Sequence, residues 1–256
     1  MKLTTHRSHD YRHLVARWRA VAKAAGMQMK QFATASGMPL YFLKSKKLGE
    51  VGGIYISTGI HGDEPGATEG LLAWAEKNVR RLAALPCILF PCLNPWGLTN
   101  NRRIDEEGRD LNRFFHHDDL PMVAALKKIV APYRFAVSLM LHEDYDGHGI
   151  YIYETERARP FWAEKLLAAG RRAIPLDRRE KIDGRKTSLP GIVRRKIKPV
   201  TFADIGFPEA IYFHLEKSER TFTIETPSEF ALDQRVAAHV AVIDACVKLA
   251  LTPRRT

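Results

Sequence analysis

GGIYISTGIHGDEPG, residues 52–66, indicates a buried strand that runs into a turn and then into a helix. Its first nine residues are apolar or small, which is typical of a strand covered on both faces. Pro65 and Gly66 are expected to open the helix, because proline suits the first helical turn. We expect this helix to continue to about Leu85. A strand followed by a helix favours a parallel sheet with helices between its strands.

The rest of the chain continues this alternation. We predict helices over 9–25, 120–131, 159–172 and 229–251, and strands over 52–60, 87–93, 135–141 and 149–154. QMKQFATAS and MPLYFLKSK predict an antiparallel pair around Gly37, and EAIYFHLE (209–216) and RTFTIET (220–226) predict two strands around a turn. No helix or strand is predicted over 177–206, which is basic and rich in turn formers. The fold class is therefore α/β, with a mixed, mostly parallel central sheet covered by helices on both faces.

Length and composition limit the class of protein. The chain has 256 residues, 45% of them hydrophobic, and it carries no repeat and no linker rich in Gly and Ser. We therefore expect one domain over residues 1–256. The N-terminus MKLTTHRSHDYRHLVARW has charges where a signal peptide is apolar, and no run approaches the about 20 apolar residues of a membrane span. These features predict a cytoplasmic protein with no membrane partner.

The net charge of +11 comes from scattered clusters at 171–172, 178–179, 194–196 and 254–255. A solvated basic surface explains them, and steering of an anionic substrate is the alternative. Nucleic acid is not expected as a partner, because no basic face with interleaved aromatic residues is present. The oligomeric state does not follow from these features.

Cys87, Cys92 and Cys246 lie in apolar segments and are odd in number, which predicts reduced, buried thiols. A metal site made by Cys87 and Cys92 is disfavoured. Their spacing of five on one strand would point the two side chains to opposite faces.

Three residues are candidate metal ligands: His61 and Glu64 in HGDEPG, and His142 after the apolar strand 135–141. Two imidazoles and one carboxylate, with a fourth position left for water, are the donors of a catalytic zinc ion. Each also has an ordinary explanation when taken alone. Glu64 suits the first turn of a helix, and His142 suits a hydrogen-bonded core histidine.

The loop NPWGLTNNRRIDEEGRDLNRFF (94–115) offers groups that recognise a carboxylate. Asn112 and Arg113 place an amide beside a guanidinium, whose fork binds a carboxylate in a bidentate way. Arg103 can polarise a carbonyl group. A solvated polar loop is the ordinary explanation of either fragment alone. Because ligands bind at the carboxyl ends of strands in α/β sheets, we expect this loop to share one rim with His142 and Glu225.

Taken in order, HGDEPG, NPWGLTNNRR, GRDLNR, a strand ending in His142 and a strand ending in TIET resemble the zinc carboxypeptidases. The similarity is strongest to bacterial cytoplasmic members such as the murein peptide amidases. It spans residues 59–225 and leaves the first 50 residues and 177–206 unexplained.

The resemblance implies a role for each matching residue. His61, Glu64 and His142 would hold one Zn²⁺ ion, Asp110 would accept the other ring N–H of His61, Arg103 would be the electrophilic arginine, Asn112 and Arg113 would bind the terminal carboxylate, and Glu225 would be the catalytic carboxylate. A carboxylate near zinc can take a proton from water and pass it to the leaving amine.

Four features depart from the family or stay open. Arg102 adjoins Arg103, so a slip of one residue would exchange them. Glu143 and Asp144 follow His142, where a carboxylate would repel an acidic substrate group or bind a basic one. Tyr212 is expected in the core rather than against a substrate. His116 and His117 are expected at the surface or in packing.

These features predict a zinc metallocarboxypeptidase that hydrolyses an amide bond next to a free carboxylate in a small peptide, with cell-wall peptides as one candidate. Glu225 would be the general base. The alternative is an N-acyl amino acid deacylase resembling aspartoacylase or succinylglutamate desuccinylase, whose arginine and DLNR segment are closer than the nine residues from Arg103 to Asn112. A binding module without activity would normally have lost a ligand or Glu225.

Overall fold

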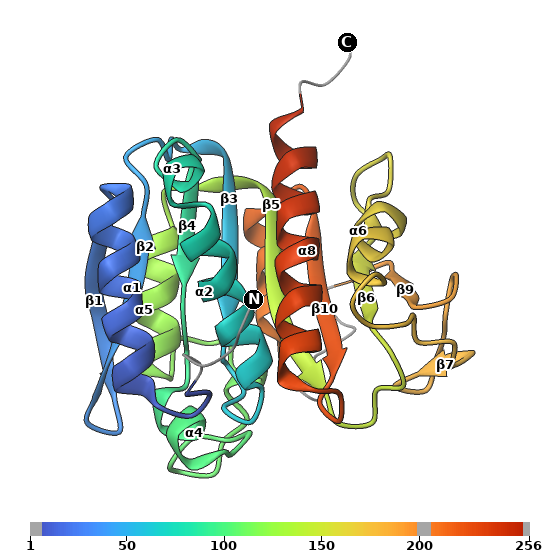
Figure 1. Cartoon of the computed structure of the whole chain (residues 1–256), viewed down its shortest axis with the longest axis horizontal. Helices are drawn as coiled ribbons and strands as arrows, with labels where there is room; N and C mark the ends of the chain where they lie inside the picture. Colours follow the sequence, from blue (N-terminus) through green and yellow to red (C-terminus); the bar gives the residue numbers. More distant parts are fainter. Residues whose placement is uncertain (1–6, 199–205, 253–256) are drawn as a thin grey trace.

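The computed structural model describes residues 7–198 and 206–252. An eight-stranded sheet runs through it in the order β1-β2-β4-β3-β5-β10-β6-β9 (Figure 1). These strands are β1 (Gln28–Ala35), β2 (Met38–Lys44), β3 (Val51–Thr58), β4 (Cys87–Phe90), β5 (Arg134–Asp144), β6 (Tyr151–Thr155), β9 (Ile192–Arg195) and β10 (Thr221–Pro227). Strands β4, β3, β5 and β10 are parallel, whereas β2 and β6 run antiparallel to them. The predicted mixed sheet is confirmed.

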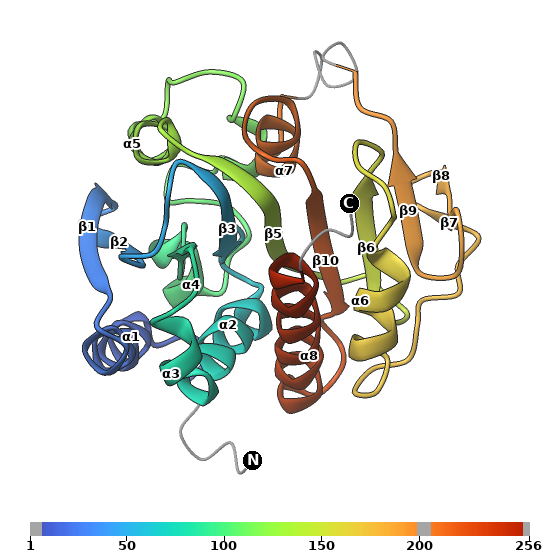
Figure 2. The ribbon, with the colours of Figure 1, turned by 90° about the horizontal axis from the view of Figure 1, so that it is seen from above.

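Helices cover both faces of the sheet (Figure 2). On one face lie α1 (Tyr11–Ala25), α2 (Pro65–Lys77), α3 (Val79–Leu82), α6 (Ala163–Gly170) and α8 (Leu232–Leu251), and on the other lie α5 (Pro121–Val130) and α7 (Glu209–Tyr212). Because successive side chains of a strand point to opposite faces, Ile54 and Ile56 pack under the first layer and Tyr55 under the second. The fully apolar strands of the sequence are explained by these two cores.

The central parallel strands bring chemically active residues to one edge. In the register of β10 and β5, Glu225 lies opposite His142. In the register of β3 and β5, Thr58 lies opposite Leu141, so the turn that carries His61 follows beside His142. Residues far apart in the sequence therefore meet at the carboxyl ends of these strands, as the sequence predicts.

The strand predicted over 209–216 is wrong. Residues Glu209–Tyr212 form α7, and a single π-helical turn follows over Phe213–Lys217. The alternating apolar residues suggested a strand, but Pro208, which has no N–H to donate to a neighbouring strand, stands at the N-cap of a helix. Phe213 then packs against Tyr55, with ring centroids 4.0 Å apart.

Other boundaries differ by a few residues. The helix predicted from Pro65 to Leu85 is interrupted at Asn78, where α2 ends and α3 begins. The helix predicted over 159–172 is limited to α6, and the strand predicted over 87–93 ends at Phe90, before Pro91. The helix predicted over 229–251 begins at Leu232.

The basic stretch 177–206 contains structure that was not predicted. It forms a hairpin of β7 (Lys181–Ile182) and β8 (Arg185–Lys186), and then the edge strand β9. Residues 199–205 lie outside the described part. The three cysteines are buried free thiols, as predicted. Within the described ranges, no helix is long and apolar enough to cross a membrane.

Candidate active site

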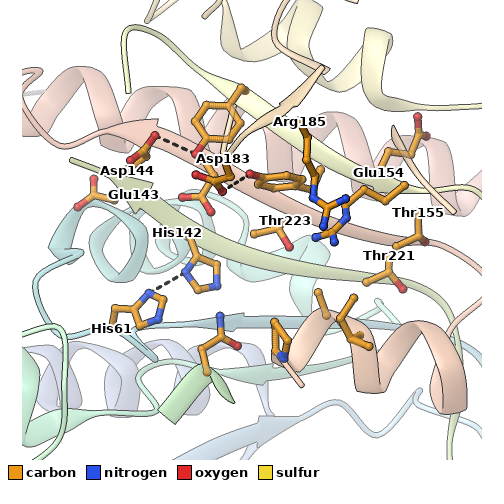
Figure 3. A pocket seen from close by; sticks show the side chains of 18 of the residues that line it. His61, His142, Glu143, Asp144, Glu154, Thr155, Asp183, Arg185, Thr221 and Thr223 are labelled. Carbon is orange, nitrogen blue, oxygen red and sulfur yellow. Dashed lines mark hydrogen bonds between the residues drawn. The ribbon is translucent and has the colours of Figure 1, made fainter. Parts of the chain in front are cut away.

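A pocket of about 480 Å³ opens at the carboxyl ends of the central strands and extends toward β6 and β9 (Figure 3). Its lining includes most of the residues selected from the sequence: His61, Glu64, Arg103, Asn112, Arg113, His142 and Glu225. Asp110 is the remaining selected residue and contacts His61. Tyr212 is not in the lining; it packs against Phe213 instead.

His61, Glu64 and His142 converge on one point. Glu64 Oε1 lies 2.6 Å from Nδ1 of His61, and Glu64 Oε2 lies 2.9 Å from Nδ1 of His142. The two Nδ1 atoms are 3.3 Å apart, and all three side chains are buried. Among the described residues, no other group of three His, Cys, Asp or Glu side chains has ligand atoms within 4.8 Å of one another. Two imidazole nitrogens and a carboxylate that meet in this way fit a zinc ion.

The turn between β3 and α2 allows this convergence. Glu64 is the N-cap residue of α2, yet its side chain makes no capping hydrogen bond and faces the imidazoles instead. Gly62 lets the turn lie against α4 (Pro95–Asn100), because a Cβ at that position would come within 1.9 Å of the Gly97 backbone. A side chain at position 62 would therefore displace the turn.

Asp110 supports His61 from the side opposite Glu64. Its Oδ1 lies 3.2 Å from Nε2 of His61, and its Oδ2 accepts a hydrogen bond from Nη2 of Arg103 at 3.1 Å. Burial favours a higher pKa for Asp110, but His61, Arg103 and Arg113 outweigh it and hold the pKa well below its usual value. An ionised Asp110 favours the proton on Nε2, which leaves the lone pair of Nδ1 available to a metal ion.

The charges of the triad reinforce one another. Burial acts to raise the pKa of Glu64, but the two neighbouring imidazoles outweigh it, and the pKa is lowered. Burial acts to lower the pKa of His61, but Glu64 and Asp110 outweigh it and raise that pKa. The carboxylate is thereby kept ionised, which a metal ligand requires.

Arg103, rather than Arg102, faces this site. Its Nη1 lies 3.6 Å from Oε1 of Glu64, and its side chain lines the pocket. Arg102 is exposed and does not line the pocket. Of the two neighbouring arginines, Arg103 is therefore the one that lines the pocket.

Asn112 and Arg113 offer hydrogen-bond donors side by side. Asn112 Oδ1 accepts a hydrogen bond from the backbone N–H of Glu209 at 2.8 Å, so its Nδ2 is left to donate into the pocket. Arg113 Nη1 donates to the backbone oxygen of Asn112 at 2.8 Å. Glu209 is buried behind Asn112, where it accepts a hydrogen bond from the Tyr55 hydroxyl and where burial raises its pKa. This contact of Glu209 was not predicted, because residues 209–216 alternate like a strand and were expected to form one.

Glu225 of β10 lines the same pocket as Arg103. Among the described residues, no hydrogen bond or ion pair engages its carboxylate. Burial raises its pKa well above the usual value, and the carboxylates of Glu64 and Asp144 add to the effect, while His142 and Arg103 oppose it. A carboxyl group with a raised pKa is typical of a group that transfers protons.

The carboxylates that follow His142 are both engaged by protein groups. Glu143 accepts hydrogen bonds from Nη1 of Arg235 at 2.8 and 2.9 Å and from the backbone N–H of Gly66 at 3.0 Å. Asp144 accepts from the Tyr151 hydroxyl at 2.9 Å and from Arg179 at 3.1 Å. Glu143 therefore connects α2 with α8, and neither group stands as a bare anion beside the triad.

The far end of the pocket was not anticipated from the sequence. Its lining includes Thr155, Asp183, Arg185, Arg195, Thr221 and Thr223. One signal was available: Asp183 and Gly184, with φ of 49° and 70°, form the Asp-Gly turn that is typical of a two-residue hairpin. That signal predicts the hairpin, but not that it reaches the pocket.

Comparison with known proteins agrees with both resemblances. Residues 50–137 match the family described as the succinylglutamate desuccinylase/aspartoacylase catalytic domain. This stretch contains His61, Glu64 and DLNR, and it ends before His142 and Glu225. No curated protein matches the chain by sequence.

Solved structures share the fold over most of the chain. A Shewanella amazonensis SB2B protein, provisionally assigned as a metallopeptidase, is 20% identical with a TM-score of 0.85, and the match covers 97% of this chain and 96% of that one. The metallo-carboxypeptidase from Burkholderia cenocepacia is 15% identical with a TM-score of 0.69 over 93% and 68% of the two chains. The murein-tripeptide amidase MpaA from Escherichia coli O157 is 16% identical with a TM-score of 0.57 over 89% and 93%. The fold is therefore that of the metallo-carboxypeptidases.

Proposed function

We propose that this protein is a zinc-dependent hydrolase that cleaves an amide bond next to a free carboxylate in a small peptide. The observation that carries this proposal is the convergence of His61, Glu64 and His142 in the same pocket as Arg103 and Glu225. The first three would hold one zinc ion. The metallo-carboxypeptidase and amidase names of proteins with this fold support the same class of reaction.

Glu225 and Arg103 have different roles in the proposed hydrolysis. Zinc, when bound, supplies Lewis-acid chemistry that makes water nucleophilic near neutral pH and polarises a carbonyl group. Glu225 takes a proton from the attacking water and delivers it to the leaving nitrogen. Arg103 donates to the negative charge that develops on the carbonyl oxygen, and loss of such a donor typically costs about 3–4 kcal/mol of transition-state stabilisation.

Substrate orientation follows from Asn112 and Arg113. The Nδ2 group of Asn112 and the guanidinium of Arg113 bind the free carboxylate of the residue to be released. This contact places the neighbouring amide bond toward Arg103 and Glu225. Cell-wall peptide fragments in the cytoplasm are the first candidate substrates.

A second candidate is an N-acyl amino acid deacylase. The match of residues 50–137 to the desuccinylase and aspartoacylase family favours it. Both reactions use the same metal ligands and the same free carboxylate, and they differ in whether a peptide or a simple acyl group leaves. The nine residues from Arg103 to Asn112 favour the peptidase.

The test is release of an amino acid by the zinc-loaded protein from dipeptides, muropeptides and N-acyl amino acids, measured by mass spectrometry. We expect Glu225→Gln to retain zinc and lose turnover by orders of magnitude, whereas Glu229→Gln, which alters an exposed carboxylate outside the pocket, keeps both. Release from no member of the panel would contradict the proposal. Faster turnover of acyl amino acids than of dipeptides would select the deacylase.

A further inference from the structure

The pocket has a second polar end, away from His61, Glu64 and His142 (Figure 3). It is formed by Thr155 of β6, Thr221 of β10, Arg195 of β9, and Asp183 and Arg185 of the β7–β8 hairpin. We refer to these five residues as the distal subsite. Most of them come from the basic stretch whose role neither the sequence motifs nor the proposed chemistry explains.

The alternation of side chains along β9 separates two neighbouring arginines. Arg194 turns toward α6, where its Nε lies 3.0 Å from Glu154 and its Nη2 lies 2.6 Å from Glu164. Arg195 points to the opposite face, lies in register with Thr155 and lines the pocket. Arg194 is therefore committed to an ion-pair network, while Arg195 belongs to the wall of the subsite.

The distal subsite carries an excess of positive charge. Arg185 and Arg195 both line it, and the Asp183 carboxylate accepts a hydrogen bond from the Tyr153 hydroxyl. Burial lowers the pKa of Arg195, and the nearby cation of Arg185 lowers it further, while Tyr153 and Asp183 act in the opposite direction. Two cations held together in a partly buried cavity are stabilised when an anion joins them.

Two hydroxyl groups indicate an absent hydrogen-bond partner. Thr155 is 9% exposed and Thr221 is 1% exposed. Neither Oγ1 atom has a hydrogen-bond partner among residues 7–198 and 206–252. Buried polar groups are nearly always hydrogen-bonded, so these hydroxyls are suited to a polar group from outside the chain. Thr155 lies beside Arg195, because the two are register partners of β6 and β9. Thr221 lies on the other side of Thr155, since the next residue of β10, Phe222, pairs with Glu154 of β6.

We propose that the distal subsite binds a second carboxylate, at the end of the side chain of the residue that the enzyme releases. The preferred substrate would then carry an acidic residue next to the scissile amide. This inference rests on the proposed function for the contact of the first carboxylate with Asn112 and Arg113. The second contact depends on Arg185 and Arg195, whose guanidinium groups bind carboxylates with charge-assisted hydrogen bonds.

The first experiment compares two peptides that differ only in a C-terminal Glu or Gln. We expect the wild type to prefer Glu in kcat/KM, and Arg195→Met and Arg185→Met each to reduce the Glu-to-Gln ratio about 10- to 100-fold. Lys186→Met is the matched control, because it removes one positive charge from the same hairpin at a residue that does not line the pocket. It should leave the ratio unchanged.

The second experiment measures binding without turnover. By calorimetry with the zinc-loaded protein, we expect glutarate to bind more tightly than butyrate, and Arg195→Met to abolish the difference. Thr155→Val and Thr221→Val should weaken glutarate binding without lowering the melting temperature, since the wild-type hydroxyls have no described protein partner.

The outcomes separate the two proposals. Selective glutarate binding that needs Arg195, in a protein that cleaves no substrate, would support the subsite and contradict the proposed function. Cleavage of Glu and Gln peptides at equal rates, unaffected by Arg195→Met, would overturn the subsite and leave the proposed function intact. Inorganic phosphate that binds more tightly than glutarate would also overturn the assignment of a carboxylate.

Discussion

At the scale of single residues, His61 is held through both ring nitrogens, with Glu64 on one side and Asp110 on the other. We expect Asp110→Ala to weaken zinc binding about 10- to 100-fold, because the imidazole loses the acceptor that fixes its tautomer and orientation. Competition with a chelator measures this change. Glu107→Ala removes an exposed carboxylate of the same loop and should bind zinc as the wild type does. Equal affinity of both variants would contradict the role of Asp110.

The proposed role of Asn112 in substrate binding can be tested because its side-chain oxygen and nitrogen have different partners. Asn112→Asp keeps an oxygen for the backbone N–H of Glu209 but replaces the donor in the pocket with a negative charge. We expect KM for a substrate with a free terminal carboxylate to rise by at least about tenfold, because like charges meet where a donor stood. Steady-state kinetics measures the change, and unaltered KM would remove Asn112 from substrate binding.

At the scale of elements, the contact between α2 and α8 supports the metal-binding turn. Glu143 is fully buried between Gly66 at the start of α2 and Arg235 in α8. At a pH where Glu143 is ionised, we expect Arg235→Met to destabilise the protein by about 3–5 kcal/mol, the usual cost of leaving a buried charge without its partner. The loss should be smaller in acid, because burial raises the pKa of Glu143 to about 7 and protonation removes the uncompensated charge.

Urea denaturation measures this change. Lys248→Met is the control in the same helix, because its partner Asp244 is far less buried and exposed pairs contribute only about 0–1 kcal/mol. Similar unfolding free energies for Arg235→Met and the wild type would show that the contact between α2 and α8 does not depend on this ion pair.

Helices and strands whose own residues carry a clear pattern were predicted well. Those that depend on contacts with distant residues were not. The stretch 52–66 combines an apolar run with a proline at the helix start, so both β3 and α2 follow from the sequence. Residues 209–216 alternate like a strand, yet they fold as helical turns because Phe213 fits between aromatic residues of β3 and β5. Local pattern could not predict that packing.

At the scale of the whole molecule, we expect a buried neutral histidine to make the fold sensitive to acid. Burial, aided by Arg235, lowers the pKa of His239 to about 3. Between about pH 6.5 and that value the unfolded chain binds a proton that the folded protein does not. Stability should therefore decrease as the pH falls through this window, by up to about 1.4 kcal/mol per pH unit for one group.

We expect His239→Gln to reduce the pH dependence of the unfolding free energy by about one proton between pH 6.5 and pH 4.5, since glutamine does not titrate. The amide can still reach the Thr226 hydroxyl, which contacts Nε2 of His239 at 3.1 Å. Denaturation at a series of pH values measures the slope. An unchanged slope would mean that other groups cause the acid sensitivity.

The overall arrangement of the site could be predicted only in part. His61, Glu64, His142 and Glu225 were selectable because each follows or ends an apolar strand, and parallel strands end at one edge. Arg185 and Arg195 were not selectable as site residues. They reach the pocket because β9 lies beside β6 at the end of the sheet. The order of strands in a sheet cannot be predicted from the residues of a single strand.

The proposed chemistry depends on one zinc ion bound between His61, Glu64 and His142. The most direct test is an anomalous difference map recorded at the zinc absorption edge from a crystal of the zinc-loaded protein. We expect one dominant peak within bonding distance, about 2.0–2.2 Å, of Nδ1 of His61, a carboxylate oxygen of Glu64 and Nδ1 of His142. No peak there, or a dominant peak on other residues, would contradict it.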